Sequence, residues 1–118
     1  MKSICIAVIA ILFSSSTKND KLTGTWQRVI PGGDVVYRIT FTADNTFEGY
    51  VNEKPFVSGT YTLRDSIFAI EDFGCPDIPG TYKVNFFGND DSCRLQVIND
   101  ACDGRLAQAD NAILYRIK

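Results

Sequence analysis

The side chains of this sequence that could do chemistry are four cysteines and several scattered acidic residues, and histidine is absent. Without an imidazole, Ser-His-Asp and Cys-His catalysis and histidine-based metal sites are excluded. Cys5 lies inside an apolar N-terminal run, so three cysteines remain for a folded domain: Cys75, Cys93 and Cys102. An odd number leaves one thiol unpaired. Because Arg94 is the only basic residue beside Cys93, we expect Cys93 to be unreactive.

The acidic residues form no recognisable catalytic or metal-binding pattern. The pair Asp90–Asp91 and the nearby Asp100 and Asp103 could suggest calcium, but they lack the ligand number and spacing of a calcium loop. Glu48 and Glu53 could be a glycosidase pair, yet nothing in the sequence places them face to face. We therefore expect no catalytic residue, no metal and no cofactor, and a protein that is not an enzyme. A net charge of −2 without a basic stripe also argues against a nucleic-acid partner.

The first 16 residues, MKSICIAVIAILFSSS, have the pattern of a secretory signal peptide. One lysine precedes an apolar run at 4–13, which would span roughly 15 Å as a helix, half of a bilayer core. We therefore predict no membrane span. The alternative is an apolar first strand, but the charged residues at 17–21 are typical of a linker. The predicted organisation is a signal peptide at 1–16, a linker at 17–21 and a β-domain at 22–118.

The end of this segment, LFSSSTKND, resembles a bacterial lipoprotein signal, except that Ser16 occupies the position of the lipid-bearing cysteine. Serine has no thiol with which to form the thioether. We therefore expect export without a lipid anchor, to the periplasm, the cell surface or the medium. A lipid anchor would be expected only if Ser16 replaced an original cysteine.

From Leu22 onward, short segments rich in Val, Ile, Thr, Tyr and Phe alternate with turn residues every 8–12 positions. We expect strands at 22–30, 35–42, 46–52, 56–63, 66–71, 81–87, 93–98 and 112–117, and one or two helical turns at 104–110. In 66–71 the inward face is ambiguous, because four consecutive residues are apolar. Consecutive strands favour an antiparallel meander, and closure removes its open edges. The sequence thus predicts an all-β fold: an antiparallel up-and-down barrel of about eight strands, with room inside for side chains or one small ligand.

The connections of this meander differ between its two ends. The longer ones, at 31–34, 53–55, 72–80 and 99–111, meet at one end, which we call the mouth; the tight turns at the other end form the floor. Cys75 and Cys102 both fall in mouth loops, whereas Cys93 begins a strand at the floor with inward parity. We therefore predict a disulfide between Cys75 and Cys102 and a buried free thiol at Cys93.

Gly24-Thr25-Trp26 on the first strand resembles the Gly-x-Trp motif of the lipocalins and related calycins. The stretch DACDGR ahead of the last strand is similar to small bacterial envelope domains of this type. The resemblance implies that Trp26 closes the barrel floor and that Arg116 packs across its ring. A guanidinium on an indole face stabilises by roughly 0.5–2 kcal/mol, and Gly24 removes a side chain where the backbone is crowded. Trp26 could equally be a plain core anchor or face a ligand.

Strand parity gives the expected inward wall: Tyr37, Ile39, Phe47, Val51, Tyr61, Leu63, Tyr82, Val84, Leu95 and Val97. At the mouth, Phe73 has little core to join and should cover the opening or lie exposed for a partner. Arg105 should form an ion pair with Asp100 or Asp103, or else contact an anionic ligand.

The sequence therefore predicts an exported, non-enzymatic, lipocalin-like β-barrel that binds a small hydrophobic ligand. The alternative is a cell-envelope module with a filled barrel, which binds or inhibits an envelope protein through its loops. An empty apolar cavity of roughly a few hundred cubic ångströms would favour the ligand carrier.

Overall fold

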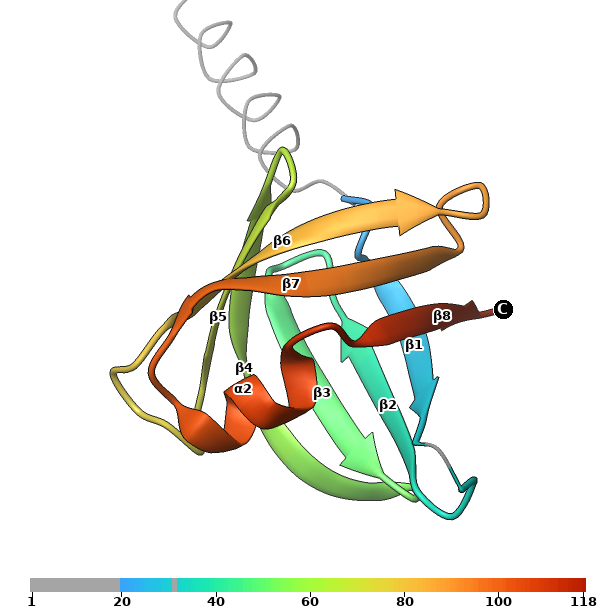
Figure 1. Cartoon of the computed structure of the whole chain (residues 1–118), viewed down its shortest axis with the longest axis horizontal. Coiled ribbons are helices and arrows are strands. Elements are labelled where there is room, and N and C mark those ends of the chain that lie inside the picture. Colours follow the sequence, from blue (N-terminus) through green and yellow to red (C-terminus); the bar gives the residue numbers. More distant parts are fainter. Residues whose placement is uncertain (1–19, 31) are drawn as a thin grey trace, which may run out of the picture.

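The computed structural model describes residues 20–30 and 32–118, and within it eight antiparallel strands form a closed barrel in chain order (Figure 1). The predicted signal peptide, most of the predicted linker, Cys5, Ser16 and Pro31 lie outside the described residues. The strands are β1 (Gly24–Val29), β2 (Val36–Phe41), β3 (Thr46–Val51), β4 (Lys54–Arg64), β5 (Ile67–Asp72), β6 (Gly80–Phe87), β7 (Ser92–Asp100) and β8 (Ile113–Ile117), and one helix, α2 (Asp103–Ala109), lies between β7 and β8. The predicted eight-stranded up-and-down barrel is confirmed.

The connections divide into a floor and a mouth. Short turns at 42–45, 65–66 and 88–91 join β2 to β3, β4 to β5 and β6 to β7 at the floor. At the mouth, the β5–β6 loop and α2 lie next to each other (Figure 1). Helix α2 covers part of this end, in the segment where the sequence predicted one or two helical turns.

The β3–β4 connection differs from the expected loop at 53–55. It is a two-residue turn of Asn52 and Glu53, whose φ angles are 49° and 72°. Two-residue hairpins of this kind need positive φ at both central residues, which asparagine tolerates well. Strand β4 therefore begins at Lys54, and this corner of the mouth is held by strand pairing instead of a loop that can part.

Trp26 is fully buried at the floor. Its Nε1 donates a hydrogen bond of 2.8 Å to the carbonyl oxygen of Leu22, which is also fully buried. Asp20 accepts hydrogen bonds from the backbone N–H groups of Leu22 and Thr23, so the turn that begins at Asp20 is part of the floor. The folded domain therefore starts within the segment predicted as a linker.

Arg116 lies across the tryptophan, with its guanidinium carbon 4.3 Å from the ring centroid. Its terminal nitrogens donate to the carbonyl oxygens of Lys21, Thr23 and Asp90. Gly24 has a φ of +129°, and a Cβ there would lie 2.9 Å from Nη1 of Arg116. A side chain at position 24 would thus be strained and would push the guanidinium off the ring.

A layer of aromatic rings fills the floor half of the barrel above the tryptophan. Phe41 meets Tyr61 and Phe68 edge to face, with ring centroids 4.9 and 5.8 Å apart. These geometries are favourable for aromatic pairs. The Tyr61 hydroxyl donates to Asp20, and burial, together with the smaller effect of the Asp20 charge, raises the pKa of Tyr61 to about 12. The hydroxyl therefore stays protonated and ties this layer to the floor turn.

Replacing Trp26 with alanine should lower the free energy of unfolding by about 3–5 kcal/mol, because it removes a fully buried ring and leaves Arg116 without its platform. Urea unfolding measures the loss. Tyr115→Ala on the outer face of β8 is the control, since that side chain is 53 % exposed, and it should change stability by less than about 1 kcal/mol. A similar small loss for Trp26→Ala would contradict its role in closing the floor.

Candidate functional site

The mouth half of the barrel contains a cavity of about 600 Å³. This volume lies within the range of roughly 300–1,000 Å³ that is typical of small-molecule sites. Its base is the aromatic layer, including Phe41, Phe47 and Phe68, and its rim is formed by the mouth loops and α2. The interior is therefore filled at one end and hollow at the other.

Five residues of the predicted inward wall line this cavity: Tyr37, Ile39, Phe47, Tyr82 and Leu95. The other five do not. Tyr61 and Val84 are buried in the core of the floor half, and Leu63 and Val97 are half-buried against that core. Val51 is half-buried at the end of β3, beside the tight β3–β4 turn. Strand parity places these side chains on one face, but it does not indicate how far up the barrel the packed layer reaches.

Several cavity-lining residues were not expected from the sequence. Phe68 and Ile70 supply the inward face of β5, where the apolar run left the facing ambiguous, while Ile67 is exposed. Val57 and Leu114 add apolar surface from β4 and β8. Two of the missed lining residues had a readable signal in the sequence: Phe41 continues the period-two alternation of Tyr37 and Ile39, and Arg28 has the strand parity of Trp26.

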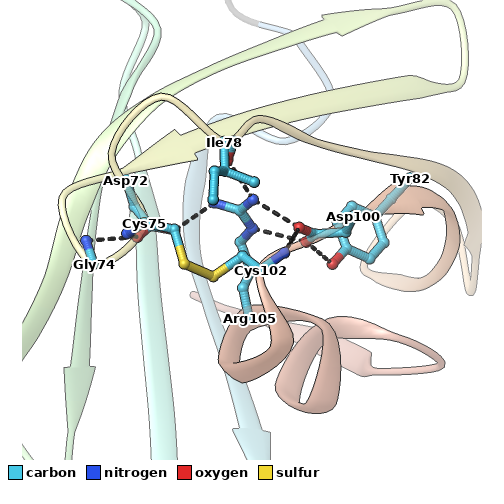
Figure 2. Close-up of a disulfide and its surroundings, with 8 residues drawn as sticks. All are labelled: Asp72, Gly74, Cys75, Ile78, Tyr82, Asp100, Cys102 and Arg105. Carbon is cyan, nitrogen blue, oxygen red and sulfur yellow. Dashed lines mark hydrogen bonds and ion pairs between the residues drawn. A yellow bond between two sulfur atoms is a disulfide. The ribbon is translucent and has the colours of Figure 1, made fainter.

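The predicted disulfide is confirmed: Cys75 and Cys102 are bonded, with Cα atoms 6.1 Å apart (Figure 2). The bond joins the β5–β6 loop to the residue that precedes α2. Cys93 is buried and is not in a disulfide among the described cysteines. Burial raises the pKa of Cys93 to about 12, so the thiol stays protonated as a small apolar side chain.

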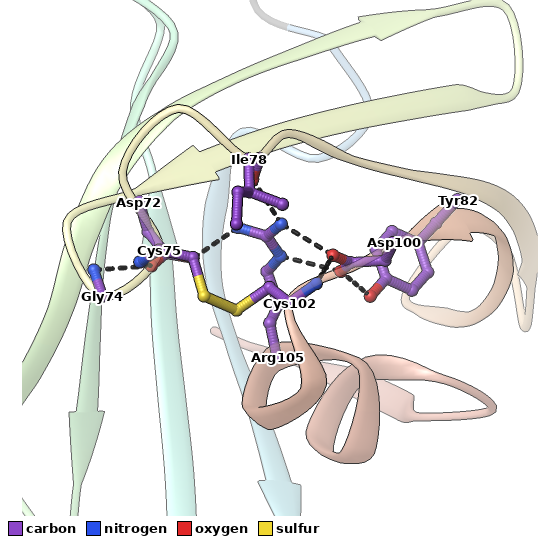
Figure 3. A network of polar contacts seen from close by, with 8 residues as sticks. All are labelled: Asp72, Gly74, Cys75, Ile78, Tyr82, Asp100, Cys102 and Arg105. Carbon is purple, nitrogen blue, oxygen red and sulfur yellow. Dashed lines mark hydrogen bonds and ion pairs between the residues drawn. A yellow bond between two sulfur atoms is a disulfide. The ribbon is translucent and has the colours of Figure 1, made fainter.

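Arg105 is the centre of a polar network beside the disulfide (Figure 3). Its guanidinium lies 2.9 Å from a carboxylate oxygen of Asp72 and 2.7 Å from one of Asp100, and it also donates to the carbonyl oxygen of Ile78. Tyr82 donates its hydroxyl proton to Asp100. The predicted ion pair to Asp100 is present, and Asp72 is a second partner that the sequence did not indicate.

The network stabilises the charged forms of Asp100 and Arg105. Burial of Asp100 works to raise its pKa, but hydrogen bonds from Arg105, Tyr82 and the backbone N–H of Cys102 outweigh this effect, so the pKa is lowered. The hydrogen bonds that Arg105 donates to Asp100 raise the pKa of Arg105 above its ordinary value. Gly80 is required beside them, because a Cβ there would lie 2.5 Å from a carboxylate oxygen of Asp100. Arg105 is thus a structural cation, fully engaged by protein groups.

Two further arginines border the cavity. Arg38 forms a two-point ion pair with Glu53, with distances of 3.0 and 2.6 Å. Arg28 lies two residues after Trp26 on β1 and therefore has the same strand parity. Its Nη1 donates a hydrogen bond to the carbonyl oxygen of Gln108 in α2. Arg28 was not among the residues expected from the sequence, although it is a charged residue with the strand parity of Trp26.

Phe73 is 79 % exposed in the β5–β6 loop and does not line the main cavity. It borders a second, more open depression formed by β3, β4 and the β5–β6 loop, which Phe56, 65 % exposed, also lines. Of the two expected positions for Phe73, the structure shows the exposed one.

Among the described residues, no group of three or more acidic or cysteine side chains is arranged to hold a metal ion. Within the same part of the chain, no helix is long and apolar enough to cross a membrane.

No family model and no curated protein matches this sequence. Among solved structures, the chain is similar to an NMR structure of a protein from Bacteroides uniformis ATCC 8492, with a TM-score of 0.57 and 20 % sequence identity, over 83 % of this chain and 90 % of that one. At this identity the similarity shows the fold alone, an eight-stranded closed β-barrel.

Replacing Asp100 with asparagine should lower the free energy of unfolding at pH 7 by roughly 3 kcal/mol, because it breaks a buried ion pair and leaves Asp72 as the remaining carboxylate partner of Arg105 among the described residues. A lowered carboxyl pKa stabilises the fold above the unfolded pKa of about 3.9, and this contribution is lost as the pH falls through the folded value. Stability measured from pH 7 to pH 2 should therefore fall less steeply in Asp100→Asn than in the wild type. Asp65→Asn, in an exposed floor turn, should leave the profile unchanged; parallel profiles for wild type and Asp100→Asn would contradict the assignment.

Removing the disulfide by the double substitution of Cys75 and Cys102 with alanine should cost about 3–4 kcal/mol, since the bond closes a loop of 27 residues. Thermal unfolding under oxidising conditions measures the difference. Cys93→Ala is the matched control, because it removes a free thiol and keeps the Cys75–Cys102 bond. It should lose about 1 kcal/mol or less, and reducing agent should destabilise this control but not the double variant. Equal stability of the double variant and the oxidised wild type would contradict a stabilising role for the bond.

Proposed function

We propose that this protein is an exported, non-enzymatic, lipocalin-like β-barrel that holds a small apolar molecule. The observation that carries the proposal is the cavity of about 600 Å³ above a filled floor. Cores are normally packed to the density of organic crystals, and voids larger than a water molecule are few. A hollow of this size with apolar and aromatic walls is the usual form of a small-molecule site.

The surrounding structure supports this function. The disulfide and the Arg105 network fix the β5–β6 loop and α2 at the mouth, so the cavity is preformed and a ligand need not order it. A disulfide is also consistent with an exported protein, because such bonds persist in oxidising compartments.

The second candidate function is the binding of an envelope protein through the mouth. Phe56 and Phe73 favour it, because both are exposed and line the same depression, and exposed apolar patches are frequent at interaction sites. This function does not need the cavity. Filling the cavity should therefore abolish the binding of a small molecule but leave the binding of a protein partner unchanged.

The test uses N-phenyl-1-naphthylamine, an uncharged probe that fluoresces in apolar surroundings. Ile39→Trp should reduce its binding at least tenfold, because position 39 lines the cavity opposite Gly49 and the larger ring fills the space. Thr62→Trp is the control with the same new ring on the exposed outer side of β4, and it should bind like the wild type. Equal binding by both variants, or no binding by the wild type, would contradict the carrier function.

A further inference from the structure

Three arginines of the described chain line the cavity, and Arg28 is the one of these three whose charge no carboxylate balances. Arg38 is paired with Glu53, and Arg105 lies between Asp72 and Asp100. Among the described residues, no carboxylate lies within 4.0 Å of the Arg28 guanidinium. Its contact with Gln108 is to a neutral carbonyl group and leaves the positive charge intact.

The position of Arg28 directs this charge to the cavity. Arg28 lines the cavity, and it lies two residues beyond the buried Trp26 on the same face of β1. A guanidinium has five N–H donors in a planar fork, and within the described part of the chain only Nη1 has an acceptor. The remaining donors are available to a group that enters through the mouth.

Tyr37 places a second donor beside this charge. It is the direct cross-strand partner of Arg28 in the β1–β2 pair, and it also lines the cavity. Side chains in such pairs lie close together on one face of the sheet. The tyrosine ring packs near Phe56, with centroids 6.5 Å apart, and its hydroxyl has no hydrogen-bond partner among the described residues.

We propose that the ligand is an anionic amphiphile, a molecule with an apolar chain and a carboxylate head. This inference rests on the proposed carrier function and adds the chemical class of the ligand. The apolar chain occupies the cavity down to the layer of Phe41, Phe47 and Phe68. The head lies at the mouth, where Arg28 binds it through charge-assisted hydrogen bonds and Tyr37 donates one more. The disulfide and the Arg105 network lie on another part of the rim and make no contact with the ligand in this arrangement.

The experiment compares laurate with dodecanol, which has a chain of the same length and an uncharged head. Each is added below its aggregation concentration at pH 7.5, and displacement of N-phenyl-1-naphthylamine gives its affinity. A carboxylate is much more strongly hydrated than a hydroxyl, so an apolar cavity without a charge partner would prefer the alcohol. With Arg28 as the partner, we expect the wild type to bind laurate at least tenfold more tightly than dodecanol.

Three variants test the assignment to Arg28. Arg28→Met keeps the length of the side chain but removes the charge, and it should bind laurate at least tenfold more weakly while dodecanol binding stays within about twofold. Arg28→Lys restores a positive charge and should recover most of the preference. Arg64→Met, which removes an exposed arginine at the floor end of β4, should behave like the wild type. Tyr37→Phe should lose about two- to fivefold in laurate affinity alone.

Near-UV circular dichroism shows whether each variant is folded. If Arg28→Met does not fold, the affinities of Arg28→Lys and Tyr37→Phe for laurate and dodecanol still decide the test. Equal affinity of the wild type for laurate and dodecanol would overturn the anionic-head inference and leave the carrier function intact. A laurate preference that survives in Arg28→Met would overturn the role of Arg28. Failure of both ligands and of the probe to bind would overturn the carrier function and this inference with it.

Discussion

Closure of the barrel between the first and last strands is the constraint on which the rest of the structure depends. Only three residue pairs join β1 to β8, so this seam is the shortest ladder in the sheet together with the one between β7 and β8. Arg116 strengthens it from the inside. Its guanidinium covers Trp26 and donates to carbonyl oxygens of the floor turn and of the β6–β7 turn, so one side chain joins β8, β1 and a third segment. Without closure there would be no enclosed interior and no cavity.

The interior is divided because large rings gather at one end. Near the floor, Trp26 contacts Phe86, and Phe41 contacts both Tyr61 and Phe68. An eight-stranded barrel has space for little more than its own side chains, so a hollow can exist only where the inward residues are smaller. Gly49 lines the cavity and has no side chain to fill it. The packed core is thus concentrated at the floor and the open space at the mouth, so a change in one need not disturb the other.

The sequence predicted the barrel because every strand is bounded by turn residues and has either period-two alternation or a short apolar run. It predicted the disulfide because the order of a meander alone places Cys75 and Cys102 at the same end. It did not indicate Asp72, which meets Arg105 across 33 positions of sequence and resembles any other aspartate at the end of a strand. The depth of the cavity was also inaccessible, since it depends on how the aromatic rings tilt against one another. The tight turn at Asn52 and Glu53 was missed because its glycine-free sequence reads as a longer loop.

The balance of charge at the mouth explains why one arginine remains available. Arg105 is almost completely removed from water, and a buried guanidinium without carboxylate partners would destabilise the fold strongly. It therefore takes both Asp72 and Asp100, and neither can serve another cation. Glu53 is on the opposite corner of the rim and is engaged by Arg38. Arg28 lies between these pairs and is only partly buried, so water can solvate its charge while the cavity is open. An anion that enters the cavity replaces this water in surroundings of lower dielectric constant, where its attraction to the guanidinium is stronger. Of the three cavity-lining arginines, the two that stabilise the mouth are thus neutralised by carboxylates, and Arg28 keeps an unbalanced positive charge.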